Sequence, residues 1–254
     1  MKKQEKFDKV IFGLVGKNIS YSFSKGYFLN KFIKHKLDNH LYLNFDIENI
    51  EDLLGVINKY KTSIKGLNIT IPYKQSIFKY LDKIDKTAKK IGAVNTVGFT
   101  DNGELKGYNS DVFGFKNSLV PLLQKHHTNA LILGTGGASN AVSFVLEELG
   151  LKYYKVSRAP KQKEQISYSE INKELIRETT IIINCSPVGT FPNIEDKPLL
   201  PYQFITNNHL LYDLIYNPEE TSFLAEGKKH GAQIKNGLEM LELQAEESWR
   251  IWNK

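Results

Sequence analysis

The sequence predicts an α/β fold built from two successive units. Segments with strand and helix periodicity alternate through the first 100 residues, which is the pattern of an α/β layer. A second alternation begins near residue 111, and in it a glycine cluster, Gly134 with Gly136 and Gly137, stands between a buried strand and a helix. Since the chain contains no internal repeat or low-complexity linker, any boundary must run through compact structure near residue 110 and again near 236.

The elements of the first unit follow from the spacing of apolar residues. A short apolar run predicts a strand over Val10–Gly16, and aromatic residues at helical spacing predict a helix over residues 24–36. Alternation of apolar and polar residues predicts a strand over residues 41–47, and helical spacing returns over residues 50–60. The remaining expected strands are 66–71, which ends at Pro72, and the hairpin strands 93–99 and Leu105–Tyr108 around an Asp-Asn-Gly turn.

The second unit shows the same alternation of short apolar runs and amphipathic segments. The expected strands are 130–133, 153–156, 180–184 and Leu210–Asp213. The expected helices are 111–124, 137–149, 221–230 and a long amphipathic C-terminal helix over 237–252.

Composition excludes several classes of protein. The chain has 254 residues and a net charge of +6, but its lysines are spread along the sequence and form no zinc-finger or basic-zipper pattern, which argues against nucleic-acid binding. No apolar run approaches the roughly 20 residues that span a bilayer, and the N-terminus lacks a signal-peptide core. A mild positive field favours anionic ligands.

Cysteine and histidine usage argues against disulfides and metals. The single cysteine, Cys185, allows no intramolecular disulfide, and the six histidines show no metal-ligand spacing. We therefore expect a cytoplasmic location and no metal. We expect Cys185 to be a small buried residue, and His126 and His127 to lie in a solvated loop.

The glycine cluster is a candidate dinucleotide site. Glycines at Gly134, Gly136 and Gly137 allow a tight turn and a close approach of the backbone to a diphosphate, and the following helix offers free N–H groups. The third position of the usual pattern is Ser139, another small residue. The alternative is a glycine turn that serves only packing.

The end of the next strand indicates which dinucleotide would bind. NAD-binding units usually place an acidic residue there, whereas this strand ends in Ser157 and Arg158, with Lys161 and Lys163 nearby and no acidic residue before Glu164. A guanidinium pairs with a 2′-phosphate in a forked contact, so the sequence favours NADP. The alternative for Arg158 is a solvated cation at a strand end.

Two further polar positions precede a predicted helix. Ser22 and Ser24 are two residues apart after the first strand, so their hydroxyls either cap the helix or hold a small carboxylate.

Together these features resemble the shikimate dehydrogenase family over nearly the full length of the chain. The matching stretches are SYSFS (20–24), LNITIPYK (67–74), GAVNTV (92–97), GYNSDVFGF (107–115), LGTGGASNA (133–141), SR (157–158), NCSPVGT (184–190), YDLIYNPEETSFL (212–224) and NGLEMLELQAEESWRIW (236–252). Each stretch alone is weak, but their number and order make the resemblance specific.

The resemblance implies a two-domain architecture and an activity. The first domain, residues 1–110 plus 237–254, would bind the substrate and would be completed by the C-terminal helix. The second, residues 111–236, would be a Rossmann-like NADP-binding domain. The implied reaction is the NADP-linked, reversible reduction of 3-dehydroshikimate to shikimate, which belongs to chorismate and aromatic amino-acid biosynthesis.

The resemblance also assigns roles to individual residues. Lys74 and Asp111 correspond to the catalytic pair. The positions that match substrate contacts are Ser22, Ser24, Thr70, Asn95, Tyr216 and Gln244. The positions that match cofactor contacts are Gly134, Gly136, Gly137, Ala138, Ser157, Arg158, Leu214 and Gly237. We expect Lys74 to donate a proton to the carbonyl oxygen and Asp111 mainly to orient Lys74 and the substrate hydroxyl.

The chain departs from the usual family pattern at a few positions. Asn18 and Lys25 replace prolines, and Tyr21 replaces a histidine. Ser157 replaces an asparagine, and Glu239 stands where a small residue is common.

Two alternative functions stay open. One is a quinate/shikimate dehydrogenase that uses NAD, against which Arg158 argues. The other is a ligand sensor of the same fold without catalysis, against which the retention of Lys74 and Asp111 argues. We expect a small-molecule substrate and neither a nucleic-acid nor a membrane partner, and the sequence leaves open whether the protein is a monomer or a homodimer.

Overall fold

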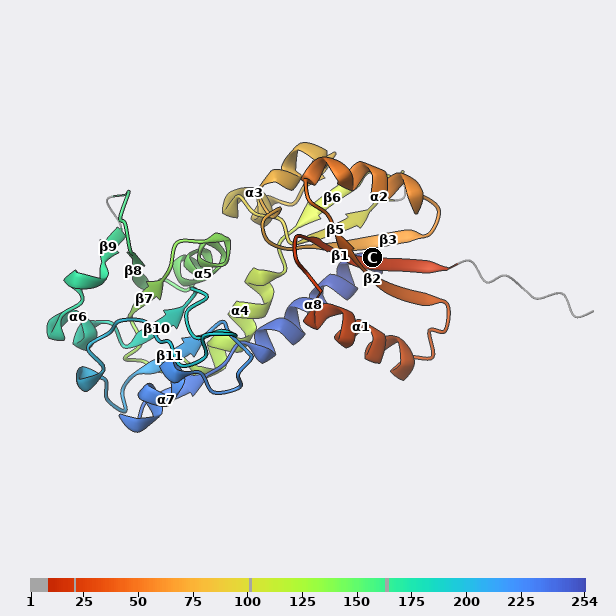
Figure 1. Cartoon of the computed structure of the whole chain (residues 1–254). Helices are drawn as coiled ribbons and strands as arrows, with labels where there is room; N and C mark the ends of the chain where they lie inside the picture. The colour runs from red at the N-terminus through yellow and green to blue at the C-terminus, as the bar shows by residue number, and fades with distance from the viewer. Residues whose placement is uncertain (1–8, 21, 101, 163–164) are drawn as a thin grey trace, which may run out of the picture. The chain divides into compact units, whose positions relative to one another are not determined.

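The computed structural model divides the chain into two compact units (Figure 1). Unit 1 comprises Met1–Ser110 together with Gln244–Lys254, and unit 2 comprises Asp111–Leu243. The structure describes residues 9–20, 22–100, 102–162 and 165–254. Tyr21, Lys163 and Glu164, which entered the sequence argument, lie outside the described residues.

Unit 1 contains a mixed six-stranded sheet. The strands run in the order β2-β1-β3-β5-β6-β4. Strand β1 pairs in parallel with β2 and β3, whereas β3, β5 and β6 pair antiparallel. The strands are β1 (Val10–Gly16), β2 (His40–Asp46), β3 (Ile64–Ile69), β4 (Lys83–Ile84), β5 (Thr96–Phe99) and β6 (Leu105–Tyr108).

Helices cover both faces of this sheet (Figure 1). Helix α1 (Phe23–Lys34) lies on one face together with the unit 1 part of α8 (Leu238–Trp252), which begins at Gln244. Helices α2 (Leu53–Lys59) and α3 (Lys86–Ile91) lie on the other face. Short 3₁₀ helices, η1 (Ile50–Asp52) and η2 (Ser76–Tyr80), adjoin the second layer.

Side-chain alternation along β1 explains the two cores of unit 1. Phe12 and Leu14 point to the face that packs against Phe28 and Trp252, whereas Ile11 and Val15 join the other core. The part of α8 that belongs to unit 1 is also fixed to the sheet by polar contacts, since Trp252 Nε1 donates to the Val97 carbonyl at 3.0 Å. The C-terminal helix therefore completes the first domain, as the resemblance implied.

Unit 2 contains a fully parallel six-stranded sheet in the order β12-β11-β10-β7-β8-β9. Numbered from β7, this order read from the β9 edge is 3-2-1-4-5-6, the order of a doubly wound dinucleotide-binding fold. The strands are β7 (Asn129–Leu133), β8 (Lys152–Ser157), β9 (Gln165–Ser167), β10 (Ile181–Asn184), β11 (Leu210–Asp213) and β12 (Gln233–Lys235).

Helices also flank the second sheet on both faces. Leu131 and Ile182 pack against residues of α6 and α7, and the ring of Tyr212, on the opposite face, contacts Phe115 of α4. The helices are α4 (Asp111–Leu119), α5 (Gly137–Glu148), α6 (Lys173–Glu178) and α7 (Ser222–Lys229), with 3₁₀ helices η3 (Val120–Leu122), η4 (Tyr168–Glu170) and η5 (Tyr202–Phe204).

The predicted α/β class and two-domain fold are confirmed, with differences in detail. Helix α4 ends at Leu119, and a 3₁₀ turn containing Pro121 follows, because proline lacks the N–H that would continue the helix. Among the described residues the sequence patterns missed the short strands and helices β4, α3, β9, α6 and β12, and the 3₁₀ helices η2, η4 and η5. Helix α8 begins at Leu238 in unit 2 and continues from Gln244 in unit 1. The division between the compact units therefore falls at 243/244, and the functional boundary at 236/237 stays a proposal.

The prediction that both histidines of the 126–127 pair are solvated is wrong for His127, which is 4% exposed. The Gln124 N–H donates to His127 Nδ1 (3.0 Å), so Nδ1 carries no proton and Nε2–H faces the Asn208 carbonyl at 3.3 Å. His126 Nε2 contacts the same carbonyl oxygen at 3.0 Å. Burial is the main cause that lowers the pKa of His127. The ring is a neutral link between two loops.

This link predicts a pH dependence of stability. Because the pKa of His127 is lower in the folded protein than the ordinary value near 6.5, the unfolded chain takes up a proton first as the pH falls. The contribution of His127 is therefore complete above about pH 7 and declines below about pH 6.5. We expect the difference in free energy of unfolding between wild type and His127→Asn to shrink from pH 8 to pH 5, measured by urea unfolding. A difference independent of pH would contradict this account.

Candidate functional site

In unit 1 the candidate substrate residues follow the carboxyl ends of two parallel strands. Strand β1 ends at Gly16 and β3 ends at Ile69, and the Thr70 N–H donates to the Val15 carbonyl at 2.9 Å. Ser22 and Ser24 come after the first strand, and Thr70 and Lys74 come after the third. Parallel pairing therefore brings these two loops to the same edge of the sheet.

The two serines have different local roles. Ser22 is the N-cap of α1, and its Oγ accepts from the Lys25 N–H at 3.4 Å, so its hydroxyl proton stays available to a ligand. Ser24 lies in the first turn of α1 and hydrogen-bonds to Tyr42, a fully buried tyrosine whose hydroxyl in turn donates to Asn68 Oδ1 at 2.8 Å. Capping and ligand binding are thus compatible at Ser22.

Asn68 is the centre of a buried polar cluster beneath this edge. Its Nδ2 lies 2.9 Å from Ser248 Oγ and 3.3 Å from Thr96 Oγ1. Thr96 Oγ1 and Ser248 Oγ are themselves 2.9 Å apart, and both residues are fully buried. Because a buried polar atom without a partner is costly, these mutual bonds fix Asn68 and hold α8 against β3 and β5.

The cluster continues to Asn95 and the segment before Asp111. Asn95 is 5% exposed, and its Oδ1 accepts from the Ser110 N–H at 2.7 Å. The Val94 N–H donates to the Lys74 carbonyl at 2.8 Å, so the backbone of Lys74 is attached beside Asn95. Asp111 follows Ser110 as the first residue of α4 and is 3% exposed, whereas Lys74 is half-buried.

Two further candidate substrate residues lie on other elements. Gln244 is half-buried on α8, one turn before Ser248. Tyr216 is half-buried in the loop after β11, and burial raises the pKa of its hydroxyl.

In unit 2 the glycine turn has the geometry of a diphosphate cradle. Gly134 directly follows β7 and has φ of 113°, a conformation that favours glycine, and a Cβ there would lie 3.3 Å from the backbone of Cys185. A Cβ at Gly136 or Gly137 would meet no atom within 4 Å, so open space adjoins the start of α5. Gly136 is the N-cap of α5 and makes no side-chain cap.

This cradle fits a dinucleotide on physical grounds. The first turn of α5, which contains Ala138, offers N–H groups and the positive end of the helix dipole to an anion. The turn also lies between β7 and β10, where the strand order reverses, which is where ligands bind in open α/β sheets.

Arg158 lies just after β8 and is exposed. Among described residues its guanidinium has no ion-pair partner, so it is available to a phosphate. Ser157 Oγ accepts from the Ala159 N–H at 3.2 Å, which shapes the turn that presents Arg158. Ser157 pairs with Ser167 of β9, which places Tyr168 beside this turn.

The edge at β10 and β11 contains functional candidates that sequence reasoning missed. Asn184 and Asp213 are fully buried at the ends of these strands, and Asn184 Nδ2 donates to Asp213 Oδ1 at 3.1 Å. Leu214 follows Asp213, and a Cβ on Gly237 would collide with the Leu214 carbonyl, so the two predicted cofactor residues are neighbours. In the sequence, Asn184 and Asp213 could have been recognised as candidates because each is a polar residue at the end of a strongly apolar strand.

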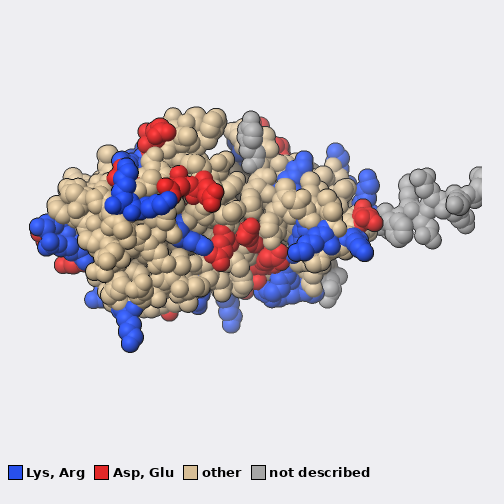
Figure 2. Space-filling view, turned by 90° about the horizontal axis from the view of Figure 1, so that it is seen from below, with Lys and Arg blue, Asp and Glu red and all other residues tan. Residues whose placement is uncertain are grey.

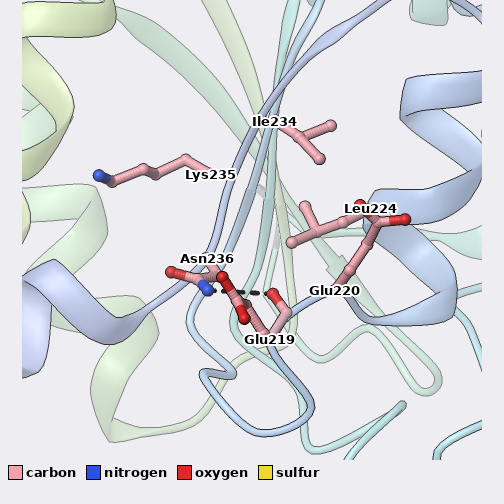
Figure 3. A pocket seen from close by; sticks show the side chains of 6 residues that line it. All are labelled: Glu219, Glu220, Leu224, Ile234, Lys235 and Asn236. Carbon is pink, nitrogen blue, oxygen red and sulfur yellow. Dashed lines mark hydrogen bonds between the residues drawn. The ribbon is translucent and has the colours of Figure 1, made fainter.

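A pocket of about 430 Å³ adjoins the same loops (Figure 3). It is lined by Glu219, Glu220, Leu224, Ile234, Lys235 and Asn236. In Figure 3 Lys235 extends away from Glu219 and Glu220, and it forms an ion pair with Glu239. None of the predicted site residues lines this pocket, which is a neighbour of the cofactor edge rather than the cradle itself.

Comparison with known proteins identifies the family. Residues 14–97 match the model of the shikimate dehydrogenase substrate binding domain. Over 261 aligned residues the chain is 42% identical to the shikimate dehydrogenase (NADP(+)) of Methanococcus vannielii, with 96% of this chain and 91% of the relative covered. The chain belongs to the shikimate dehydrogenase family.

Solved structures of the family agree over both units. Shikimate dehydrogenase 1 from Peptoclostridium difficile is 39% identical with a TM-score of 0.80, covering 96% of this chain and 91% of that one. The shikimate 5-dehydrogenase of Thermus thermophilus in complex with NADP(H) and shikimate is 31% identical with a TM-score of 0.82, covering 96% and 93%.

Two departures from the family pattern now have a physical account. Asn18 has φ of 57°, and its N–H donates to Asp46 Oδ1 at 2.9 Å. Proline fits neither observation, because its φ is fixed near −65° and it has no N–H. The Lys25 N–H likewise donates to Ser22 Oγ, which a proline could not do. Hydrogen bonds therefore hold the backbone at these two positions, one in the loop after β1 and one in the first turn of α1.

Charged, apolar and metal-ligating residues indicate whether other kinds of site are present within the part of the chain that the structure describes. On the face in Figure 2, basic and acidic side chains are interspersed. In the described ranges no helix is long and apolar enough to cross a membrane, and no group of three or more His, Cys, Asp or Glu is placed to hold a metal. Cys185 is half-buried, and burial raises the pKa of its thiol, which disfavours a nucleophilic role.

Proposed function

We propose that this protein is an NADP-dependent shikimate dehydrogenase that catalyses the reversible reduction of 3-dehydroshikimate to shikimate, in the pathway to chorismate and the aromatic amino acids. The observation that carries the proposal is the match to enzymes of this name over both units, not over one domain alone. The enzyme is an oxidoreductase that acts on a CH–OH group with NADP(H).

We propose that the cradle of unit 2 binds the cofactor. Gly134, Gly136, Gly137 and Ala138 would receive the diphosphate, since open space and the uncapped start of α5 lie there. Arg158, supported by the Ser157 turn, would pair with the 2′-phosphate. Leu214 and Gly237 would contact the nicotinamide end.

In unit 1 the polar edge would bind the substrate. Ser22 and Ser24 would hold the carboxylate, with Ser22 as a donor because its cap uses only an oxygen lone pair. Thr70, Asn95 and Gln244 would contact the ring hydroxyls and carboxylate, and Tyr216 of unit 2 is a further substrate-side residue. The hydrogen bond from the Ser110 N–H to Asn95 Oδ1 supports the assignment of Asn95, because it fixes the Asn95 side chain before the substrate arrives.

For the chemical step we propose Lys74 and Asp111. NADPH supplies a hydride to the carbonyl carbon when it is bound. Lys74, as an ammonium group, stabilises the negative charge that develops on the carbonyl oxygen and donates a proton to it. In the reverse direction the neutral amine accepts the proton of the alcohol. Asp111 orients Lys74 and the substrate hydroxyl, which its burial at the start of α4 favours.

The partners of the enzyme are small molecules, and we propose none among nucleic acids or membranes. We also propose that it works in the cytoplasm, since a chain with the single cysteine Cys185 has no need of an oxidising compartment.

The direct test measures the initial rate of NADPH formation from shikimate and NADP by its absorbance, with NAD and with quinate in parallel. We expect fast turnover with shikimate and NADP and little with the other pairs. Comparable rates with NAD or quinate would favour the broader quinate/shikimate enzyme. Absence of turnover by folded protein, with binding of shikimate, would favour the sensor of the same fold.

Lys74→Ala tests the proton donor. We expect kcat to fall by at least about 100-fold with little change in KM, because the lost interaction acts mainly in the transition state. Lys79→Ala, which changes an exposed lysine in η2, is the matched control and should be near wild type. Near-normal turnover of the Lys74 variant would refute the role.

Arg158→Gln tests cofactor choice. We expect KM for NADP to rise by about 10- to 100-fold, as for loss of a charged hydrogen bond, while KM for NAD changes little. Arg177→Gln, at an exposed arginine of α6, serves as control. An equal change for both cofactors would show that Arg158 does not read the 2′-phosphate.

A further inference from the structure

Asp213 is a buried carboxylate to which neither the sequence nor the proposed mechanism gives a role. It ends β11 and is 0% exposed. Three donors face it: Asn184 Nδ2 and the Ile215 N–H reach Oδ1 at 3.1 and 3.0 Å, and Thr221 Oγ1 reaches Oδ2 at 2.6 Å. A carboxylate accepts all three bonds, so the ionised form is the form that this site satisfies.

The partners of Asp213 come from both ends of the loop that follows it and from a neighbouring strand. Ile215 is the second residue of the loop after β11, and Thr221 ends that loop as the N-cap of α7. Asn184 is on β10, and its Nδ2 also donates to the Val188 carbonyl at 3.2 Å. One carboxylate thus fixes both ends of the 214–221 loop and attaches them to the loop after β10.

The loop that Asp213 fixes carries residues assigned to the cofactor and the substrate. Leu214 and Tyr216 lie within it, and the Gly237 N–H donates to the Ile215 carbonyl at 3.0 Å. A second brace joins Asn236 Nδ2 to the Glu219 carbonyl at 3.0 Å, the dashed bond in Figure 3. A shift of the loop would therefore displace Leu214 and Gly237 together.

The charge of Asp213 is sensitive to pH. Burial raises its pKa to about 6, against the bonds from Thr221, Ile215 and Asn184, which lower it. Among the described residues, Cys185 and Tyr202 are titratable groups that interact electrostatically with Asp213. Burial raises the pKa of each, so both stay neutral near pH 6. Protonation of Asp213 would place an O–H group opposite three hydrogen-bond donors, so at least one of the three bonds would be lost.

We propose that Asp213 is a positioning residue whose carboxylate holds the 214–221 loop, with Leu214 and Gly237, in the conformation that receives the nicotinamide end of NADP(H). This inference rests on the proposed function, since it assumes that the glycine cradle of unit 2 binds NADP(H). It predicts that cofactor affinity depends on a residue that does not touch the cofactor.

The test is the affinity of the full-length protein for NADPH, followed by the fluorescence of the bound dinucleotide, which needs no turnover. We expect Asp213→Asn to bind NADPH about 10-fold more weakly, because a charged acceptor of three bonds is lost. His209→Asn is the matched control: His209 is 3% exposed at the opposite end of β11 and donates from Nε2 to the Ile176 carbonyl. It should lower stability without changing NADPH affinity.

A pH series separates positioning from general destabilisation. As the pH falls from 7.5 to 5.5, wild type should lose more NADPH affinity than Asp213→Asn, so that the ratio of their dissociation constants approaches one. The 2′-phosphate of the cofactor also titrates in this range, but it does so equally for both proteins. Thr221→Val, which removes the donor to Oδ2 and the side-chain cap of α7 but keeps the carboxylate, should give a smaller loss of affinity and provides the test if Asp213→Asn does not fold.

The outcomes distinguish this inference from the proposed function. Unchanged NADPH affinity in Asp213→Asn and Thr221→Val, with lowered stability, would overturn the inference and leave Asp213 a structural residue. Weaker NADPH binding in both variants, from a wild type without shikimate turnover, would support the inference and refute the enzyme assignment. Failure of wild type to bind NADPH would overturn both.

Discussion

Parallel pairing brings the carboxyl ends of β7, β8, β10, β11 and β12 to one edge of their sheet, and the cofactor residues proposed for unit 2 lie at the ends of these strands or shortly after them. The same constraint acts on β1 and β3 in unit 1, which place the serine loop and the Thr70 loop side by side. Residues far apart in sequence can therefore act on one ligand. The residues of these loops can vary, whereas the topology of the sheet fixes the edge at which the loops meet.

Rigid support beneath each edge comes from buried polar groups rather than from apolar packing alone. In unit 1 the amide oxygen of Asn68 accepts a hydrogen bond from Tyr42, and the amide nitrogen donates to Thr96 and Ser248. In unit 2 the carboxylate of Asp213 accepts from three donors. Such networks are costly when incomplete, so they hold one geometry. The binding residues that we propose above them would be positioned before a ligand arrives, which lowers the entropy that binding must overcome.

The sequence was informative where a physical requirement forces a residue type. The glycine turn at Gly134, the apolar run of β1 and the hairpin of β5 and β6 were all readable. Strands β4 and β9 were not, because two or three residues are too few to show a period, and their pairing partners come from elsewhere in the chain. The burial of His127 was hidden for a similar reason, since its partner Asn208 is remote in sequence.

Roles within the site were predictable only in part. Resemblance to a family suggested Lys74 and Asp111, and no periodicity distinguishes a catalytic lysine among 34 Lys and Arg residues. Asn18 shows the converse case, in which a departure from the family looked like a loss. Its left-handed backbone and its bond to Asp46 show instead that another set of interactions supports the loop.

The path of the chain through the two units has a consequence for biosynthesis. Unit 2 is complete once residue 243 has been made, whereas unit 1 still lacks Gln244–Lys254, which supply Ser248 and Trp252 to its core. During translation the inserted unit can therefore fold while the unit that began first is unfinished. Until Gln244–Lys254 leave the ribosome, the sheet of unit 1 exposes Phe12 and the polar side chains of Asn68 and Thr96. A chaperone could bind this exposed surface during that time.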